Sequence, residues 1–487
     1  MIYQLKNRTQ TIAINICLAA VLFFSLSCNS QKTKESEDIP IISKILSDKT
    51  SKFYIDFEKY PKERKSLAIG IFDSGTGGLT VLEKFLVCDE YNNATGEIQP
   101  DGIPDFENED FNYLGDIANM PYGNYSQENK TEYLRELIIK DALFLLKEKS
   151  SKIIVVACNT ATAYGLEDIS VLLKKSGTNI HVIGVINAGV NATLLPLNRD
   201  ADYAIGVLAT AGTIASNAYE KTILKTKDEL GFTGNIIVVN QSGAGFAESV
   251  DGEKDYTDRN LIAMCDNYRG PKCGDEENNI KDYLMDVYNF DLTNGALFTK
   301  QIGDSSLQVQ LNSSENYARF HLVSLIEKYR LSGNTIPLKR IILGCTHYPY
   351  LLGTLNEVIS ELRNYTKNGE YIYKNIIADD FEFIDPALFT AKECYEALKN
   401  NKQLASQSTK GNVSAYISIP APDLSSDKLN EDGSLSYDFK YGRIQGTDDV
   451  TTIVVPFSAK HINNDVLQRL EKLVPYSYAL IRKTMEN

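Results

Sequence analysis

Residues 153–160 read IIVVACNT and carry the clearest structural signal in the chain. Four β-branched apolar residues in a row are typical of a strand buried on both faces of a parallel sheet. An alanine and Cys158 end this strand, and Asn159 with Thr160 is suited to begin a helix. Because open α/β sheets bind ligands at the carboxyl ends of their strands, we expect Cys158 to lie at a functional site. A helix N-terminus beside its sulfur would favour the thiolate.

A second stretch of the same design lies far downstream, where residues 340–347 read RIILGCTH. A single cysteine at a strand end is more often inert packing, but two in matched contexts, Cys158 and Cys345, indicate chemistry. Paired thiols could reduce a disulfide, bind a metal or move a proton between two faces of a carbon atom. The chain has no Cys-X-X-Cys pattern, and His347 is the only histidine beside either cysteine. Metal and redox interpretations are therefore poor, and proton transfer is the best one.

The composition is that of an acidic globular protein. The 487 residues are enough for two or three domains, and 43% hydrophobic with 23% charged residues is ordinary for a folded chain. The net charge of −14 argues against nucleic acid as a partner, because phosphate binding needs a basic surface. A small anionic substrate is still compatible with this charge if the pocket is locally positive.

The N-terminus has the layout of a signal peptide over residues 1–28. Basic residues precede an apolar run over residues 12–26, and Ser27 stands directly before Cys28. This ending is similar to a bacterial lipoprotein box, so we expect lipidation of Cys28; an uncleaved membrane anchor is the alternative. Residues 29–65 are expected to be a polar tether and lead-in. The mature protein would face the periplasm or the cell exterior, held to the membrane only by its lipid anchor or signal segment.

Six cysteines lie beyond the signal segment. Disulfides are permitted in an exported protein. Cys265 and Cys273 flank a Gly-Pro turn, and the sequence leaves open whether they form a local disulfide.

The folded part is expected to consist of two α/β halves of similar plan. In the first half, residues 66–200, the apolar run AIGIF is followed by the turn DSGTGG from Asp73. In the second half, residues 201–399, AIGVLA is followed by TAGT. Each half later contains a strand that ends in a cysteine. The predicted fold class is therefore α/β, with two similar parallel-sheet domains facing each other across a cleft.

Two segments fall outside this repeated plan. Residues from about 251 to 311 are acidic and loop-like, and we interpret them as an insertion that covers the cleft or contacts a partner. Residues 400–487 form a C-terminal extension with strand-like runs at 413–419 and 451–457 and a helical tail from Asn464. The sequence assigns no role to this extension.

Five short motifs, taken in order, resemble the glutamate racemases of the aspartate/glutamate racemase superfamily. They are DSGTGGL (73–79), PYG (121–123), ACNT (157–160), GTIAS (212–216) and GCTHYP (344–349). Each alone is weak, but five in the family's order are specific, and the resemblance spans roughly residues 66–399. It implies a racemase without cofactor or metal, with its site between two α/β domains and a small amino acid, above all glutamate, as substrate.

Inverting an α-carbon requires removing a proton from one face and delivering one to the other, which suits two thiols. By resemblance, Cys158 and Cys345 are these acid/base residues, and Asp73 and His347 assist the adjacent thiols. A structural role of His347 in its turn is the alternative. The residues that would hold the substrate's amino and carboxylate groups are Asp73, Ser74, Tyr122, Gly123, Asn159, Thr160, Thr346 and His347. Glu248 is a candidate in residues 241–252, where the family carries an acidic segment that contacts the substrate.

The export signal, the insertion and the C-terminal extension depart from the family pattern. Members of the family are normally cytoplasmic and feed peptidoglycan synthesis for cell-wall biogenesis. The leading hypothesis is an exported glutamate racemase; the alternatives are an aspartate or related racemase or isomerase, and a non-catalytic amino-acid-binding lipoprotein. The last alternative predicts ligand binding that survives loss of either cysteine. The oligomeric state stays open, with a homodimer as one option.

Overall fold

The computed structural model describes residues 39–485, apart from residues 259–260, 266, 303–305, 406–408 and 448. From Pro40 onward the chain forms one compact unit. The predicted signal segment and the lipidation site Cys28 lie outside the described residues. Among the helices of the described part, none is both long enough and apolar enough to cross a membrane.

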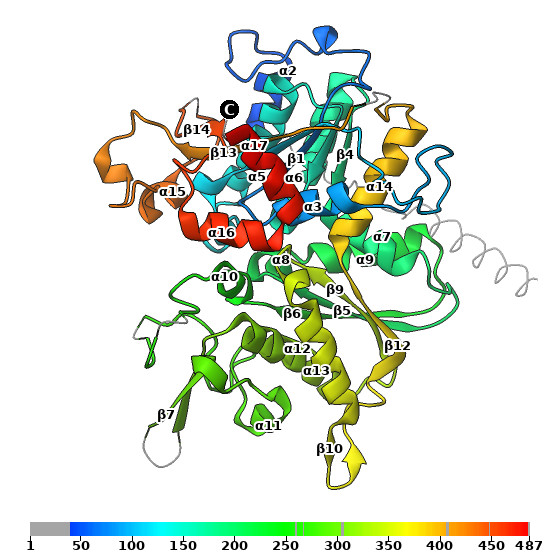
Figure 1. Cartoon of the computed structure of the whole chain (residues 1–487), viewed down its shortest axis with the longest axis vertical. Helices are drawn as coiled ribbons and strands as arrows, with labels where there is room; N and C mark the ends of the chain where they lie inside the picture. The colour runs from blue at the N-terminus through cyan, green and yellow to red at the C-terminus, as the bar shows by residue number, and fades with distance from the viewer. Residues whose placement is uncertain are drawn as a thin grey trace, which may run out of the picture. The chain divides into compact units, whose positions relative to one another are not determined.

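The first sheet has the strand order β14-β13-β2-β1-β3-β4 (Figure 1). Its strands are β1 (Ile69–Asp73), β2 (Phe111–Gly115), β3 (Ile153–Val156), β4 (His181–Gly184), β13 (Val413–Pro420) and β14 (Thr452–Pro456). All neighbours pair in parallel except β14, which runs antiparallel at the edge. Every residue of β1 and β3 is buried, as expected for parallel strands covered on both faces.

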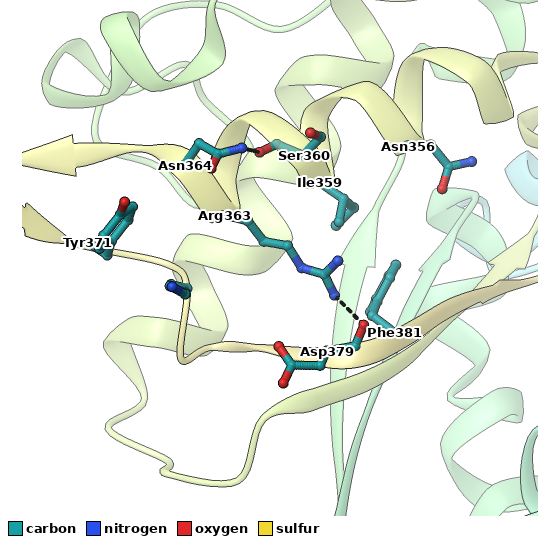
Figure 2. Close-up of a pocket in the computed structure, with 9 residues that line it drawn as sticks. Asn356, Ile359, Ser360, Arg363, Asn364, Tyr371, Asp379 and Phe381 are labelled. Carbon is teal, nitrogen blue, oxygen red and sulfur yellow. Dashed lines mark hydrogen bonds between the residues drawn. The ribbon is translucent and has the colours of Figure 1, made fainter.

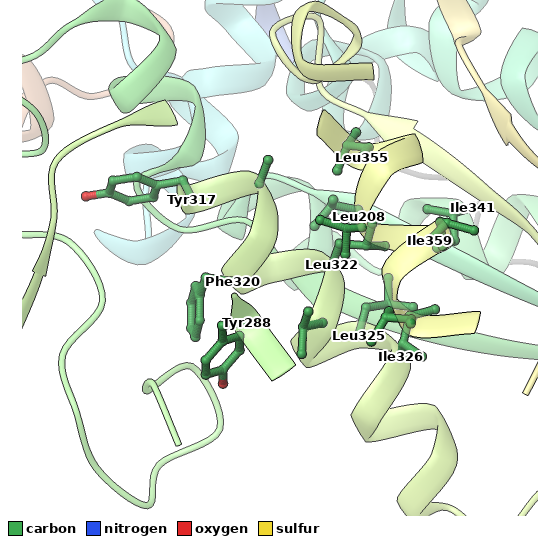
Figure 3. Close-up of a cluster of buried hydrophobic side chains, with 14 of the residues drawn as sticks. Leu208, Tyr288, Tyr317, Phe320, Leu322, Leu325, Ile326, Ile341, Leu355 and Ile359 are labelled. Carbon is green, nitrogen blue, oxygen red and sulfur yellow. The ribbon is translucent and has the colours of Figure 1, made fainter. Parts of the chain in front are cut away.

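The second sheet is wholly parallel, in the order β12-β9-β5-β6. Its strands are β5 (Tyr203–Ala209), β6 (Ile236–Ser242), β9 (Leu338–Gly344) and β12 (Ile377–Ile384). Helices α12 (Ser314–Leu331) and α13 (Leu352–Asn364) supply much of the core of this half. Figure 3 shows Leu322 and Leu325 of α12 gathered with Leu208 of β5. The predicted α/β class with two parallel sheets is confirmed.

Each half contains several further helices. In the first half they are α3 (Leu79–Val87), α4 (Gly123–Gln127), α5 (Thr131–Leu143), which continues as a π-helix (Phe144–Glu148), and α6 (Asn159–Ser176). In the second half they are α8 (Ala211–Ser216), α9 (Ala218–Glu229) and α10 (Phe246–Asp251). Ahead of the first sheet, α2 (Pro40–Leu46) buries three isoleucines, so the expected polar lead-in is structured from Pro40.

Two helices connect the halves. α7 (Val185–Leu194) leaves the first sheet and packs its apolar side against the core of the second. α14 (Pro386–Asn400) leaves the second sheet and returns to the core of the first, where Cys394 and Leu398 are buried. Helix α14, which the sequence analysis assigned to the second half (201–399), therefore contributes to the core of the first half.

The predicted insertion is partly structured. It contains α11 (Met285–Tyr288) and the hairpin β7 (Leu297–Ile302) and β8 (Ser306–Leu311), and a second small hairpin, β10 (Thr366–Lys367) and β11 (Glu370–Tyr371), follows later. Tyr288 of α11 lies with its ring centroid 5.6 Å from that of Phe320 on α12, so this segment extends the second core. Cys265 and Cys273 are both free thiols in the structure, without the local disulfide that the sequence left open.

The C-terminal extension completes the first sheet. β13 pairs in parallel with β2, and its residues Val413, Ala415 and Ile417 join the core of the first half. The extension continues with α15 (Tyr437–Gly442), α16 (Asn464–Leu473) and α17 (Pro475–Met485). A segment with no counterpart in the repeated plan is thus an integral part of the first half.

Candidate active site

Strand register brings the predicted catalytic residues to the carboxyl edges of both sheets. In the first sheet Phe72 lies opposite Val156, so Asp73 and Cys158 follow at the same edge. In the second sheet Ala209 lies opposite Gly344, and Cys345 comes next. These are the positions at which open parallel sheets bind ligands.

One cleft, with a volume of about 430 Å³, is lined from both halves. All the residues that the sequence proposed for catalysis or substrate binding line it: Asp73, Ser74, Tyr122, Gly123, Cys158, Asn159, Thr160, Cys345, Thr346 and His347. Glu248 lines it as well. The two thiols that lie far apart in the sequence therefore share one cavity.

The Cys158 sulfur caps the helix that follows it. The Ala161 amide donates to Sγ at 3.4 Å, and the thiol lies 3.5 Å from the Ser74 hydroxyl. Burial and the Asp73 carboxylate raise the pKa of Cys158 to about 12, against these two hydrogen bonds. Burial and Asp73 thus outweigh the helix N-terminus, which the sequence suggested would favour the thiolate.

Asp73 is itself buried and held by backbone. The amides of Gly75 and Gly78 donate to its Oδ2 at 3.1 and 2.9 Å. Burial raises the pKa of Asp73 even though these amides stabilise the charged form. The Asp73 carboxyl is thus held at the end of its strand, beside the Cys158 thiol.

Cys345 has a different neighbourhood, built on a histidine. Its sulfur lies 3.5 Å from Nδ1 of His347, and Nε2 of the same ring lies 3.2 Å from a carboxylate oxygen of Asp251. Burial lowers the pKa of His347, but Asp251 and Cys345 together hold it well above its ordinary value. The imidazole is therefore held as a cation between a carboxylate and the sulfur.

Asp251 is a site residue that the sequence analysis missed. It ends the short helix α10, three residues after Glu248, and the structure gives it, not Glu248, the bond to His347. Burial raises the pKa of Asp251, but the neighbouring His347 and Arg469 outweigh burial and hold this pKa below its usual range. The only sequence signal for Asp251 was its position within residues 241–252, the segment in which Glu248 was the candidate.

The glycine-rich turn after β1 makes room for the histidine. A Cβ atom at Gly77 would lie 2.5 Å from Cε1 of His347 and 2.8 Å from the Thr346 hydroxyl. A side chain at this position would displace the His347 ring or the Thr346 hydroxyl. The turn thus allows close packing across the cleft.

Tyr122 lines the cleft, but its hydroxyl is engaged elsewhere. The hydroxyl oxygen lies 2.6 Å from a carboxyl oxygen of Asp116 and 2.6 Å from one of Asp141. A phenol has a single hydrogen, so one carboxyl must carry a proton and donate it. Burial, with Asp116 nearby, raises the pKa of Asp141 well above its usual value, which identifies Asp141 as that donor. Tyr122 therefore offers the cleft its ring, not a free hydroxyl.

Asn159 and Thr160 also hold the two halves together. Tyr219 of α9 donates to Oδ1 of Asn159 at 2.7 Å, and the hydroxyls of Thr160 and Thr213 lie 3.5 Å apart. These contacts cross between the sheets at the floor of the cleft.

The added segments contribute to the rim. Arg269 and Tyr256 come from the insertion, and Tyr437 and Lys440 come from α15 of the extension. Lys440 donates to the Met120 carbonyl at 2.7 Å, next to the Pro121-Tyr122-Gly123 motif. The cleft is thus walled by segments outside the repeated α/β plan.

Among the described residues, no group of three or more His, Cys, Asp or Glu side chains could hold a metal ion. A second cavity of about 370 Å³ lies beside α13, where Arg363 donates to the Asp379 carbonyl at 3.2 Å (Figure 2). None of the residues proposed for catalysis lines it. The residues proposed for catalysis therefore gather in the interdomain cleft and not beside α13.

Several known proteins with similar sequences are named glutamate racemase. The glutamate racemase of Oceanobacillus iheyensis is 35% identical over 167 residues, 34% of this chain and 50% of that protein. Those of Geobacter metallireducens and Carboxydothermus hydrogenoformans are 27% and 25% identical over 355 and 388 residues, covering 88% and 98% of their own lengths. The match to the first relative thus spans only about half of its length. No protein-family model matches the chain.

Solved structures give a similar list of names. Glutamate racemase isoform RacE1 from Bacillus anthracis is 22% identical, with 72% of this chain and 88% of that chain covered and a TM-score of 0.43. The chain is thus similar in sequence to glutamate racemases of the aspartate/glutamate racemase superfamily.

Proposed function

We propose that the protein is a cofactor-independent amino-acid racemase that interconverts L- and D-glutamate. The observation that carries this proposal is that Cys158 and Cys345, each at a strand end of a different sheet, line one cleft. The names of the sequence relatives support glutamate as the substrate.

In the proposed reaction, one sulfur acts as thiolate and removes the α-proton from one face of the substrate. The electron pair of the broken C–H bond stays on the α-carbon and its carboxylate. The other thiol then delivers its proton to the opposite face and is left as thiolate, so protons and charge balance. The substrate's hand decides which of Cys158 and Cys345 begins as the base.

The surroundings of Cys158 suggest how a thiolate arises when substrate binds. Burial and Asp73 raise the pKa of Cys158 to about 12, so the sulfur is protonated near neutral pH. An amino acid brings an ammonium group, and its charge beside Asp73 would offset the carboxylate's effect on the thiol. Binding would thus activate the base only when a substrate is present.

Cys345 would be assisted from the other side. A protonated His347 has both ring nitrogens as donors, so Nδ1–H faces the Cys345 sulfur while Nε2–H faces Asp251. A cation 3.5 Å from the sulfur stabilises a thiolate there. The two thiols therefore have different neighbours, Asp73 beside Cys158 and His347 beside Cys345. We expect the kcat for L-glutamate to differ from the kcat for D-glutamate.

The test is proton NMR of the protein, without residues 1–28, in D₂O under reducing conditions. L-glutamate, D-glutamate and the two aspartate enantiomers are offered separately. We expect loss of the α-proton signal together with formation of the opposite enantiomer of glutamate, abolished in Cys158→Ser and Cys345→Ser. Cys265→Ser serves as the matched control, because Cys265 does not line the cleft.

Three outcomes separate the alternatives. Exchange on aspartate alone would assign the chain to aspartate racemisation. Binding of an amino acid without exchange, unchanged in both cysteine variants, would support a binding protein instead. A folded protein that leaves every α-proton in place would contradict the racemase proposal for these substrates.

The exported, lipid-anchored location is a separate proposal that rests on the sequence of residues 1–28. It predicts that the full chain sediments with membranes after expression in a bacterium that processes lipoproteins. Cys28→Ala should release it or block its processing. Membrane association that is identical in this variant would favour an uncleaved anchor.

A further inference from the structure

A residue of the C-terminal extension reaches the catalytic end of the second half. Arg469 lies on α16, which Figure 1 shows next to α10. Its Nη2 is 3.0 Å from Oδ1 of Asp251, and its Nη1 also donates to the Asp251 backbone carbonyl. Both of these contacts go to the same residue, Asp251.

The helix that carries Arg469 is anchored in the first half. Leu467 and Leu470 of α16 are buried in the core of the first sheet, as is Val474 directly after the helix. In α17, the Ser477 hydroxyl and amide both bind Glu83 of α3. The guanidinium is therefore presented from a rigid platform on one half to a carboxylate on the other.

A continuous series of contacts leads from Arg469 to the second thiol. Arg469 holds Oδ1 of Asp251, whose Oδ2 lies 3.2 Å from Nε2 of His347, and Nδ1 of that ring lies 3.5 Å from the Cys345 sulfur. The side chains of Asp251 and His347 are 23% and 15% exposed, so the carboxylate is partly accessible to solvent. Without a second anchor it would be free to turn outward.

We propose that Arg469 is a positioning residue for the proposed racemase site: by fixing the Asp251 carboxylate, it orients His347 against Cys345. The proposal rests on the racemase function only for its activity readout. It gives the C-terminal extension a role beyond completing the sheet, because the second thiol's partners are fully assembled only when α16 is docked.

The chemistry of the contact favours arginine. A guanidinium presents several donors in a fixed plane and can bind a side-chain oxygen and a carbonyl of the same residue together, as here. Lysine keeps the charge but lacks that fork. Small displacements of a catalytic group are costly, and a shift of about 1 Å can reduce the rate about 10²-fold.

The experiment compares Arg469→Met with Arg469→Lys and with Lys472→Met. Lys472 is an exposed cation on the same helix, so its variant controls for loss of one positive charge from α16. The first readout is the NMR titration of the His347 ring protons, which needs no substrate. The chain has four histidines, and His347→Asn identifies the resonance by its loss.

We expect Arg469→Met to release Asp251, so that the pKa of His347 falls toward its ordinary value. We also expect kcat to fall about 10-fold or more with a small change in KM, since Arg469 does not line the cleft. Arg469→Lys should restore part of both effects, and Lys472→Met should resemble the wild type. The other charged groups facing His347 and Asp251 are Asp73, Cys345, Glu248, Glu253 and Tyr350, and all are unchanged in every variant.

A folded Arg469→Met protein whose His347 titration and kcat match the wild type would overturn the proposal. The proposal would also be overturned if Arg469→Met lost activity only in proportion to its loss of folded protein and its His347 titration matched the wild type. If the wild type racemises none of the substrates but the His347 titration still falls in Arg469→Met, the positioning role stands and the proposed function fails.

Discussion

The Asp251 carboxylate lies 3.2 Å from Nε2 of His347, on the nitrogen opposite the one that faces Cys345. This contact joins α10 to the turn after β9, two segments separated by almost a hundred residues of chain. It turns a histidine whose role the sequence left open into a cation directed at a thiol. The electrostatics of the second half of the cleft follow from it.

Removing this carboxylate tests the arrangement directly. In Asp251→Asn the His347 ring loses the negative partner that raises its pKa, so it should be mostly neutral at pH 8. We expect kcat to fall about 10²-fold, the lower end of what positioned acid/base groups contribute. The measurement is racemisation followed by circular dichroism, with Asp255→Asn, an exposed acid outside the cleft, as control. Equal rates in the two variants would exclude Asp251 from the mechanism.

The first thiol should respond to its carboxylate in the opposite sense. Asp73 raises the pKa of Cys158, so Asp73→Asn should lower that pKa, increase the thiolate fraction and speed alkylation by iodoacetamide at pH 8. Alkylation is followed at each cysteine by mass spectrometry. Cys345, which is 6% exposed against 7% for Cys158, is the internal reference. A slower or unchanged rate at Cys158 would contradict the assigned electrostatics.

The two halves meet at a pair of glycines, which allows a steric test. A Cβ atom at Gly212 would lie 2.7 Å from the Cα atom of Gly123, a backbone contact that no side-chain rotation can relieve. Gly212→Ala should therefore widen the cleft and lower kcat/KM by about 10-fold or more, since misplaced groups lose rate steeply. Gly353→Ala is the matched control, because a Cβ there meets nothing within 4 Å. Comparable activity in both variants would show that the halves can separate without cost.

The extension should contribute to the stability of the first half. Ile417 on β13 is 1% exposed, and Ile417→Ala should lower the free energy of unfolding by about 2–5 kcal/mol. Ile444→Ala removes the same atoms from a side chain that is 63% exposed, so little change is expected. Urea denaturation of both variants measures the difference. Similar midpoints would mean that β13 is not part of the cooperative unit.

Much of the fold and the site could be predicted from local sequence alone. Buried β-branched runs ending in Cys158 and Cys345 indicated parallel strands, because such runs are stable only when both faces are covered. The repeated strand-turn pattern indicated two halves, and residues at strand ends meet at one edge of a sheet whatever the loops do. The substrate-binding residues were instead implied by the resemblance to the glutamate racemases, and they line the same cleft as the two cysteines.

Only the tertiary structure decided which groups touch. Asp251 and Arg469 lie 218 positions apart, and no pattern in the sequence around either residue predicts their contact. Tyr122 matched a motif, yet its hydroxyl is bound by two buried carboxyls. The sequence assigned no role to the C-terminal extension, yet this segment supplies two strands of the first sheet and an anchored helix. Periodicity and strand ends are properties of neighbouring residues, whereas side-chain partners depend on long-range packing, which no local pattern encodes.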